Sequence, residues 1–411
     1  MISKRRLSKQ IATYILFFST GCLYGLAKVG LGALYYLFFF SAIVGIVYLY
    51  IQNDMKICCN RRVLVYLLSL IGALTITSLI SSPDKGKSIY NIVLFSLSIL
   101  ACSYIAANWD STEIIKMLST VSSGVVFFTV GYSALFSDLA YNERGSFQGP
   151  YTAKNTMAIV VAIGMVCNLL SIIFEHHKHT KRNRRIMIPL ITIAIEAVIL
   201  IMTDGMTAIM SVLIVCALMI MYSQFGLKMN FALVLGGIHV VFYCMVISAN
   251  TGWLASLLSK LGRNLTLTGR VYIWQGLLST MSIESLIFGN GYATFWGYAG
   301  GNAVQSFIDS FINFSAASMH NGLLEIIAEG GLITLFVFLF MIYMSGKKVK
   351  SAANYYDKML YLGLVGMVGI VMMTEGFGIQ KYSFSTYILY LGVFRALYSF
   401  EESRQKRNQE G

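Results

Sequence analysis

Apolar runs of about 20 residues recur along the whole chain, each separated from the next by a short polar or basic segment. A run of this length spans the hydrocarbon core of a bilayer as an α-helix. Since no water is present there, the backbone polar groups must pair within the segment, as they do in a helix. Charged residues make up only 12% of the chain, well below the usual share in soluble domains. We therefore predict an all-α, polytopic membrane protein with one domain over residues 1–411.

The pattern predicts about twelve transmembrane helices, and an even number places both termini on one side. Of the 31 Lys and Arg residues, 22 lie in the termini and in the loops on that side. The positive-inside rule then makes both termini cytoplasmic and places residues 251–319, between spans nine and ten, on the outer face. The predicted spans are residues 11–29, 30–51, 63–81, 89–107, 120–139, 155–174, 186–203, 206–222, 231–249, 320–346, 360–373 and 382–400.

The formal net charge of +13 follows from the same topology signal, so we expect no nucleic-acid partner. None of the 7 cysteines lies in a predicted outward loop, and we expect no outward disulfide. The residues His176, His177 and His179 have metal-ligand spacing, but they lie in a strongly basic loop. No outward Asp-x-Asp pair is present either. We therefore expect neither a metal nor a cofactor.

Residues 265–281, inside the long outward segment, predict a short amphipathic helix on the outer bilayer surface. Thr268 is the expected N-cap, which places Arg270 at the positive end of the helix dipole, where an anion can bind. The alternative is that Arg270 contacts lipid headgroups. The apolar positions of this helix are Val271, Trp274, Leu277, Leu278 and Met281.

Two further candidate cations lie in the outward loop between spans five and six. Arg144 precedes a glycine, and Lys154 stands at the expected start of span six. Both can hold an anion, the second with help from the helix terminus. Here too the alternative is contact with headgroups.

The segment that enters span ten carries the best candidate for a general base. With Ser318 as the expected cap, His320 falls in the first turn, where the helix dipole disfavours its protonated form. Asn321, Glu325 and Glu329 follow at spacings of four residues and form a polar stripe on an apolar helix. Carboxylates inside a membrane are costly and are usually functional or paired. The alternative is that the stripe lines a helix–helix contact.

Together the three segments resemble the O-antigen ligase and Wzy-type polysaccharide polymerase superfamily. The resemblance covers about residues 140–345, and the flanking spans match only as hydrophobic segments. Any one of the three motifs alone is weak. The matching residues are Arg144, Gly145, Phe147, Asn155, Gly269, Arg270, Trp274, Gly289, Gly291, His320, Asn321, Leu324, Gly330, Gly331 and Leu332.

The resemblance implies a metal-independent inverting glycosyltransferase in the bacterial cytoplasmic (inner) membrane, with its active site on the periplasmic face. The donor would be a glycan on undecaprenyl diphosphate, and the acceptor a saccharide or the lipid A-core, with polymerase favoured over ligase. A chain-length regulator is a further expected partner. Arg270, Arg144 and Lys154 would hold the diphosphate. His320 would take the proton of the acceptor hydroxyl, with Glu325 as the next candidate.

The chain departs from the family pattern after span seven. The stretch Thr203–Thr207 lacks the usual cation, so either Lys154 or Arg263 would replace it or the diphosphate would be bound differently. The alternative function is that of a polysaccharide flippase or another secondary transporter, which a twelve-span architecture also suits. We disfavour transport because the long segment 251–319 has no counterpart between spans three and four.

Overall fold

The computed structural model describes residues 4–52, 61–143, 145–177, 184–225, 230–247, 269–312, 314–351, 354–381 and 383–410. Within these ranges the chain is helical, apart from loops and one isolated bridge between Tyr141 and Phe147. The helices are α1 (Lys4–Ser19), α2 (Tyr24–Lys28), α3 (Gly32–Gln52), α4 (Arg61–Ser81), α5 (Lys85–Asn108), α6 (Ser111–Leu135), α7 (Ser137–Ala140), α8 (Lys154–His177), α9 (Arg184–Met202), α10 (Met206–Phe225), α11 (Phe231–Ile247), α13 (Arg270–Thr280), α14 (Ile283–Phe288), α15 (Ala299–Asp309), α16 (Gly322–Ser351), α17 (Tyr355–Val371) and α18 (Phe384–Glu410).

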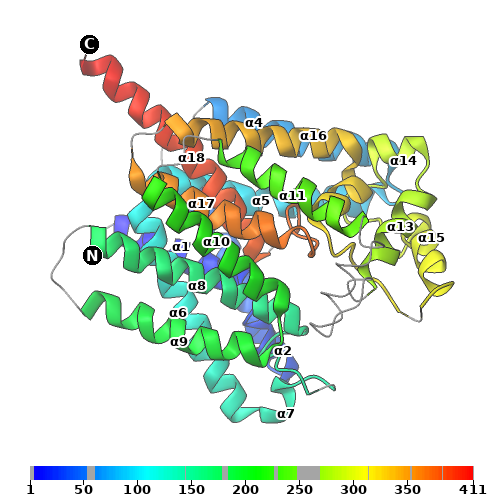
Figure 1. Cartoon of the computed structure of the whole chain (residues 1–411), viewed down its shortest axis with the longest axis horizontal. Helices are drawn as coiled ribbons and strands as arrows, with labels where there is room; N and C mark the ends of the chain where they lie inside the picture. Colours follow the sequence, from blue (N-terminus) through cyan, green and yellow to red (C-terminus); the bar gives the residue numbers. More distant parts are fainter. Residues whose placement is uncertain are drawn as a thin grey trace.

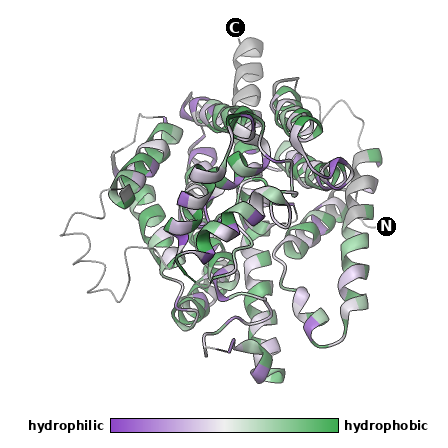
Figure 2. Cartoon of the chain, turned by 90° about the vertical axis from the view of Figure 1, so that its right-hand side faces the viewer, coloured by the Kyte–Doolittle hydropathy of each residue, from purple (hydrophilic) through white to green (hydrophobic). Residues whose placement is uncertain are grey.

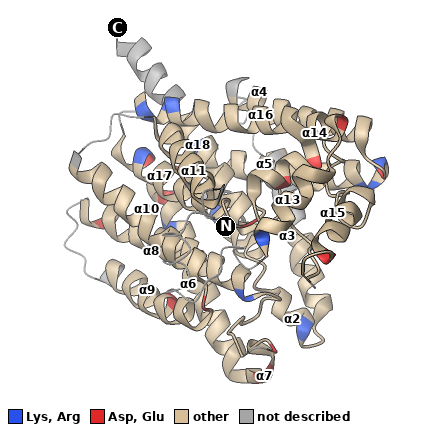
Figure 3. Ribbon diagram, turned by 45° about the vertical axis from the view of Figure 1, so that its right-hand side comes forward, with Lys and Arg blue, Asp and Glu red and all other residues tan. Residues whose placement is uncertain are grey.

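The long helices lie side by side, and the short helices α13, α14 and α15 gather at one end of them (Figure 1). The first helix begins and the last helix ends towards the opposite end (Figure 1). Figure 2 looks onto the end with the short helices, where hydrophilic residues are interspersed among the hydrophobic ones. Charged residues are sparse along the helices and lie mainly towards their ends (Figure 3). This distribution fits helices that cross an apolar layer.

Each of the twelve predicted spans overlaps one or two helices of the structure. Six helices are long and apolar enough to cross a membrane by length and composition, namely α4, α5, α6, α8, α10 and α16. Large apolar side chains are exposed on outer faces, such as Leu37 at 62% and Phe336 at 71%. Exposure on this scale is expected where lipid covers the surface. The structure is thus that of a multi-pass membrane protein, and the number of crossings stays a prediction.

Three predicted boundaries were wrong, each for a local reason. The helix α5 begins at Lys85 rather than at residue 89, because the side chain of Asp84 accepts a hydrogen bond from the backbone of Lys87. The helix α6 begins nine residues before the predicted span, because Asp110 caps it in the same way. The first predicted span is broken between α1 and α2, where Gly21 takes a left-handed backbone conformation with φ of 74°.

The helices α8 and α17 form the centre of the bundle. The most apolar window of α8 is 78% buried, whereas that of the peripheral α10 is only 28% buried. Polar side chains that enter this core are paired. Glu196 accepts hydrogen bonds from Asn168 Nδ2 at 3.1 and 3.2 Å and from Ser122. These bonds tie α6, α8 and α9 together, which meets the cost of burying polar groups in the core.

The described part of the segment predicted to face outward has its own small core, and its position relative to a bilayer stays a prediction. The helix α13 packs against α15, and the buried residues between them include Ile273, Trp274 and Leu277. Ile273, which the predicted apolar stripe did not include, is fully buried in this core, whereas Leu278 of the stripe is 64% exposed. Residues 251–268 of the predicted outward segment lie outside the described residues.

Candidate functional site

A single carboxylate joins residues from all three segments that the sequence singled out. Glu375 follows the end of α17, and its side chain is 10% exposed. Its Oε1 accepts hydrogen bonds from Arg270 Nη2 at 2.6 Å and from Asn155 Nδ2 at 3.2 Å. Its Oε2 lies 3.1 Å from Nδ1 of His320. The site therefore combines a cation, an imidazole and an amide around one acceptor, from α13, the start of α16 and the start of α8.

The imidazole of His320 is oriented by its contact with Glu375. An ionised carboxylate can only accept a hydrogen bond, so this contact assigns a proton to Nδ1. In the neutral imidazole, Nε2 then carries no proton and can accept one. The side chain of His320 is 27% exposed. An oriented imidazole with a free, partly exposed nitrogen has the arrangement required of a general base.

The backbone that presents His320 is held by Glu325. His320 has φ of 47°, in the left-handed region that few residues other than glycine adopt. Histidine is found there more often than most other residues. Oε2 of Glu325 accepts hydrogen bonds from the backbone of Met319 at 2.7 Å and from Ser318 Oγ at 3.1 Å. Ser318 Oγ in turn accepts one from the backbone N–H of His320 at 3.1 Å. Glu325, predicted as a second candidate base, is therefore placed to position the turn.

The predicted cap of span ten was wrong by three residues. The helix α16 begins at Gly322, and Oδ1 of Asn321 accepts hydrogen bonds from the backbone of Leu323 and Leu324 at 3.1 Å each. Asn321 is thus the capping residue, in place of Ser318. Its Nδ2 also donates to Tyr243 Oη at 2.6 Å. His320 consequently lies just before the helix rather than in its first turn.

Arg270 is the first residue of α13, as predicted, but the expected cap is replaced. Gly269 occupies the N-cap position with φ of 90° and provides no side-chain hydrogen bond. Thr268, the predicted cap, lies outside the described residues. The indole Nε1 of Trp274 donates to the carbonyl of Met319 at 2.9 Å. This bond fixes α13 to the turn before His320, so the cation and the imidazole are held by one local framework.

Lys154 begins α8 and reaches the turn where the family's usual cation is missing. Its Nζ lies 3.5 Å from Oδ2 of Asp204, in the turn between α9 and α10, and 3.4 Å from Ser146 Oγ. Its neighbour Asn155 contacts Glu375. Lys154 therefore borders the same site. The predicted cations Arg144 and Arg263 both lie outside the described residues.

Glycines of the resembling motifs allow two backbones to meet beside the site. Gly331 interrupts α16 with φ of 67°, and a Cβ there would lie 2.1 Å from the carbonyl oxygen of Ile287. A Cβ on Gly289 would lie 2.5 Å from the backbone of Glu329. The backbone N–H of Asn290 donates to Ala328 at 2.9 Å across this contact. The turn after α14 is thereby seated against the kink of α16.

Sequence reasoning missed Glu375, the residue at the centre of the site. Its partners are 55, 105 and 220 positions away along the chain, so no local pattern connects them. One signal was present: Glu375 is a lone carboxylate in the short connection between the last two predicted spans, which the topology prediction places outward. An outward carboxylate facing several outward cations is a candidate partner for them.

Two further cations, Lys87 and Lys381, contact aromatic rings near the start of α5. Lys87 Nζ lies 4.9 Å from the centre of the Tyr298 ring, and Lys381 Nζ lies 5.9 Å from that of Tyr90. Burial lowers the pKa of Lys381, and the nearby charge of Lys87 lowers it further. Among the described residues, no three or more His, Cys, Asp or Glu side chains form a group that could hold a metal ion.

The fold is that of a multi-pass helical membrane protein with a charged site at one end. Comparison with known proteins adds an indication of the biological process. No family model matches the chain. The chain is 26% identical over 140 residues to the exopolysaccharide production protein ExoQ of Rhizobium meliloti (strain 1021). The match covers 33% of this chain and 32% of that protein, about a third of each. This similarity supports a membrane protein related to polysaccharides.

Proposed function

We propose that this chain is a membrane glycosyltransferase that transfers glycan from a polyprenyl (undecaprenyl) diphosphate donor to a saccharide acceptor in exopolysaccharide production. The observation that carries the proposal is the convergence of Arg270, Asn155 and His320 on Glu375. The similarity to ExoQ supports polymerisation over ligation to the lipid A-core. We further propose that the site lies on the outer face of the bacterial inner membrane, as the bias in Lys and Arg residues predicts.

The chemistry divides between a base and a charge clamp. The acceptor hydroxyl oxygen attacks the anomeric carbon of the donor, and its proton passes to Nε2 of His320. The bond between the anomeric carbon and the diphosphate oxygen breaks, and its electron pair leaves with the diphosphate. Arg270 and Lys154 stabilise the charge that develops there. Glu375 keeps the imidazole oriented and stabilises the imidazolium after proton transfer, as the carboxylate of a catalytic triad does.

Arg270 can serve both Glu375 and a diphosphate. The contact with Glu375 engages Nη2, and a guanidinium carries five N–H donors in a planar fork. The remaining donors suit phosphate oxygens in a bidentate geometry. A diphosphate that enters the site would therefore add to this ion pair or displace part of it.

The deciding experiment uses purified chain in proteoliposomes with a polyprenyl-diphosphate oligosaccharide. Mass spectrometry of the products follows turnover, and binding of labelled donor is measured separately. His320→Gln keeps a polar side chain but cannot take the proton, so transfer should fall at least ~10²-fold while donor binding is largely kept. His177→Gln, in the exposed last turn of α8, is the matched control and should behave like the parent chain.

Two results would overturn the proposal. Normal turnover of His320→Gln would remove the base from this site. Failure of the parent chain to lengthen or transfer any lipid-linked glycan, with transport of the same lipid across the vesicle membrane instead, would favour the flippase alternative. A ladder of products with multiplied repeat units would identify a polymerase, and a single addition to the lipid A-core would identify a ligase.

A further inference from the structure

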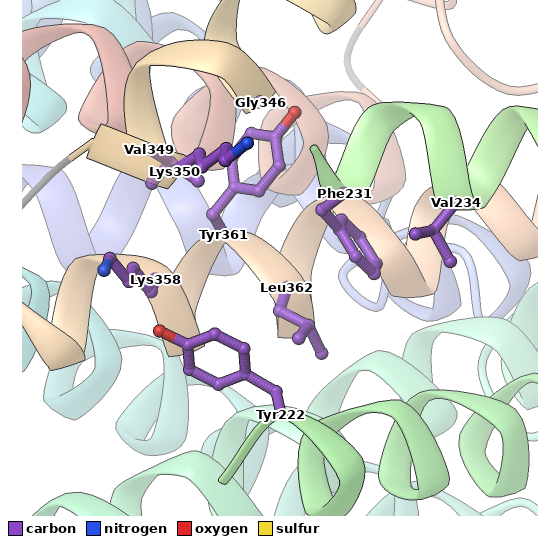
Figure 4. Close-up of a pocket in the computed structure, with 9 residues that line it drawn as sticks. All are labelled: Tyr222, Phe231, Val234, Gly346, Val349, Lys350, Lys358, Tyr361 and Leu362. Carbon is purple, nitrogen blue, oxygen red and sulfur yellow. The ribbon is translucent and has the colours of Figure 1, made fainter. Parts of the chain in front are cut away.

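A cavity lies at the other end of the bundle from the Arg270–His320 site. It is formed where α10 and α16 end and where α11 and α17 begin (Figure 4). The helix α16 connects the two regions, and its stretch from Gly322 to Gly346 would span roughly 36 Å as a straight helix at about 1.5 Å per residue. The cavity therefore takes no part in the chemistry proposed above. Its lining residues are Tyr222, Phe231, Val234, Gly346, Val349, Lys350, Lys358, Tyr361 and Leu362.

The cavity has a charged side and an apolar side. Figure 4 shows the ammonium groups of Lys350 and Lys358 and the hydroxyl of Tyr222 on one side, with Phe231 and Leu362 on the other. Among the described residues, neither lysine has a carboxylate partner within ion-pair distance. Two cations beside an apolar wall match a ligand with an anionic head and a hydrocarbon chain.

The walls of the cavity are fixed by hydrogen bonds that need no ligand. The hydroxyl of Tyr361 donates to the carbonyl of Ile342 at 3.1 Å. Asn230, just before α11, donates through Nδ2 to the carbonyl of Tyr343 at 3.4 Å. A Cβ on Gly346 would lie 2.3 Å from Oδ1 of Asn230, so the glycine permits this close approach. The cavity is thus open-sided, and its walls are preformed.

The position of the cavity along the helices matches the level of lipid headgroups. The candidate span in α10 ends at Gln224, two residues after Tyr222. Along α16 the apolar run gives way to lysines from Lys347 onwards. Tyrosine and lysine at the end of an apolar run mark the interface between hydrocarbon and water. Basic pockets between transmembrane helices at this level bind anionic lipid heads.

We propose that this cavity binds an anionic phospholipid, with the phosphate between Lys350 and Lys358 and the start of an acyl chain along Phe231, Val234 and Leu362. The phosphate oxygens accept charge-assisted hydrogen bonds from the two ammonium groups and one from the hydroxyl of Tyr222. The lipid would join the ends of α10 and α16 to the starts of α11 and α17. The proposal is independent of the glycosyltransferase assignment.

Native mass spectrometry of the purified full-length chain tests the proposal by counting bound lipids. Dihexanoyl phosphatidylglycerol provides the anionic head with chains, dihexanoyl phosphatidylcholine the zwitterionic head with the same chains, and glycerol 3-phosphate the anionic head alone. We expect one tight phosphatidylglycerol, with at least tenfold weaker binding of the other two. Equal affinity for the two lipids would overturn the charge assignment, and equal affinity for glycerol 3-phosphate would show a site for soluble phosphate instead.

Variants then assign the site to this cavity. Lys350→Ala combined with Lys358→Ala should weaken phosphatidylglycerol at least tenfold. Lys347→Ala removes an exposed lysine from the same end of α16, does not line the cavity, and should leave the affinity unchanged. Tyr222→Phe removes one hydroxyl only and should give a smaller loss, which keeps the test open if the double variant folds poorly. Parental affinity in both the double variant and Tyr222→Phe would place the lipid elsewhere.

Discussion

Glu375 has two partners that a transferase would use at different moments, the guanidinium of Arg270 and the imidazole of His320. With its charge near both, the carboxylate competes with an incoming diphosphate for the arginine. It also stabilises an imidazolium that forms later in the reaction. One side chain can therefore oppose donor binding and favour proton transfer.

This dual role predicts a divergence of kinetic constants in Glu375→Gln. The neutral amide keeps the size of the side chain but loses the charge that stabilises the imidazolium, so kcat should fall at least ~10²-fold. Arg270 loses its competitor, so the donor KM should stay the same or decrease. Steady-state transfer with varied donor concentration measures both constants, and Glu284→Gln in the first turn of α14 is the control. An unchanged kcat, or a rise in KM alone, would contradict the role given to Glu375.

At Arg270 the geometry of the cation matters as well as its charge. Arg270→Ala should lower transfer by roughly 10²- to 10³-fold, the scale for loss of one donor to a developing anion. Arg270→Lys should restore little of this, because an ammonium cannot bind Glu375 and phosphate oxygens with a planar fork. Lys85→Ala, an exposed cation at the same end of the bundle, should be neutral. Full activity of Arg270→Lys would show that only the positive charge at this position matters, and not the planar geometry of the guanidinium.

At the scale of elements, the apolar runs predicted the positions of the helices well, whereas the capping residues at the helix ends were harder to predict. The predicted spans overlap helices because an apolar run can be recognised from neighbouring residues alone. The cap of α16 was misassigned because Ser318 and Asn321 are both good caps, and the tertiary contacts of Asn321 decide between them. Glu375 was missed because its three partners come from distant segments.

The kink of α16 at Gly331 leads to a prediction about stability rather than about catalysis. Gly331 has φ of 67° and ψ of −174°, a region that other residues avoid at a cost of about 1–3 kcal/mol. In Gly331→Ala the added methyl would also press on Ile287 and separate the turn after α14 from α16. We expect a clear fall in the midpoint of thermal unfolding. Gly72→Ala is the matched control, because its Cβ meets nothing within 4 Å. Equal midpoints for the two variants would show that the kink tolerates a side chain.

At the scale of the whole molecule, the two ends of the bundle are held differently. At the end near the termini, Arg395 of α18 and Asp357 of α17 form a buried ion pair at 3.1 Å between Nε and Oδ1. Asp357 also accepts hydrogen bonds from Ser111 and Ser399, so its buried charge is well satisfied. At the other end, Glu375 is shared among groups that a substrate can engage. The charged groups at the first end thus satisfy one another, whereas under the proposed function those around Glu375 would exchange partners when a substrate binds.

The orientation of the bundle decides whether that face meets a lipid-linked donor. The Lys and Arg bias predicts that the termini are inside, and the short helices α13–α15 lie at the end of the bundle away from them (Figure 1). A cysteine at the exposed position Ser306 of α15 should therefore react with an impermeant thiol reagent in intact spheroplasts, and Ser403→Cys in α18 only after lysis. Both are made in a background with Cys58, Cys59 and Cys244 replaced by serine, because the exposed thiol of Cys244 would react as well and residues 58 and 59 lie outside the described residues. Labelling of residue 403 with protection of residue 306 would invert the topology. Arg270 and His320 would then face the cytoplasm, where a glycan already translocated to the outer leaflet cannot reach them.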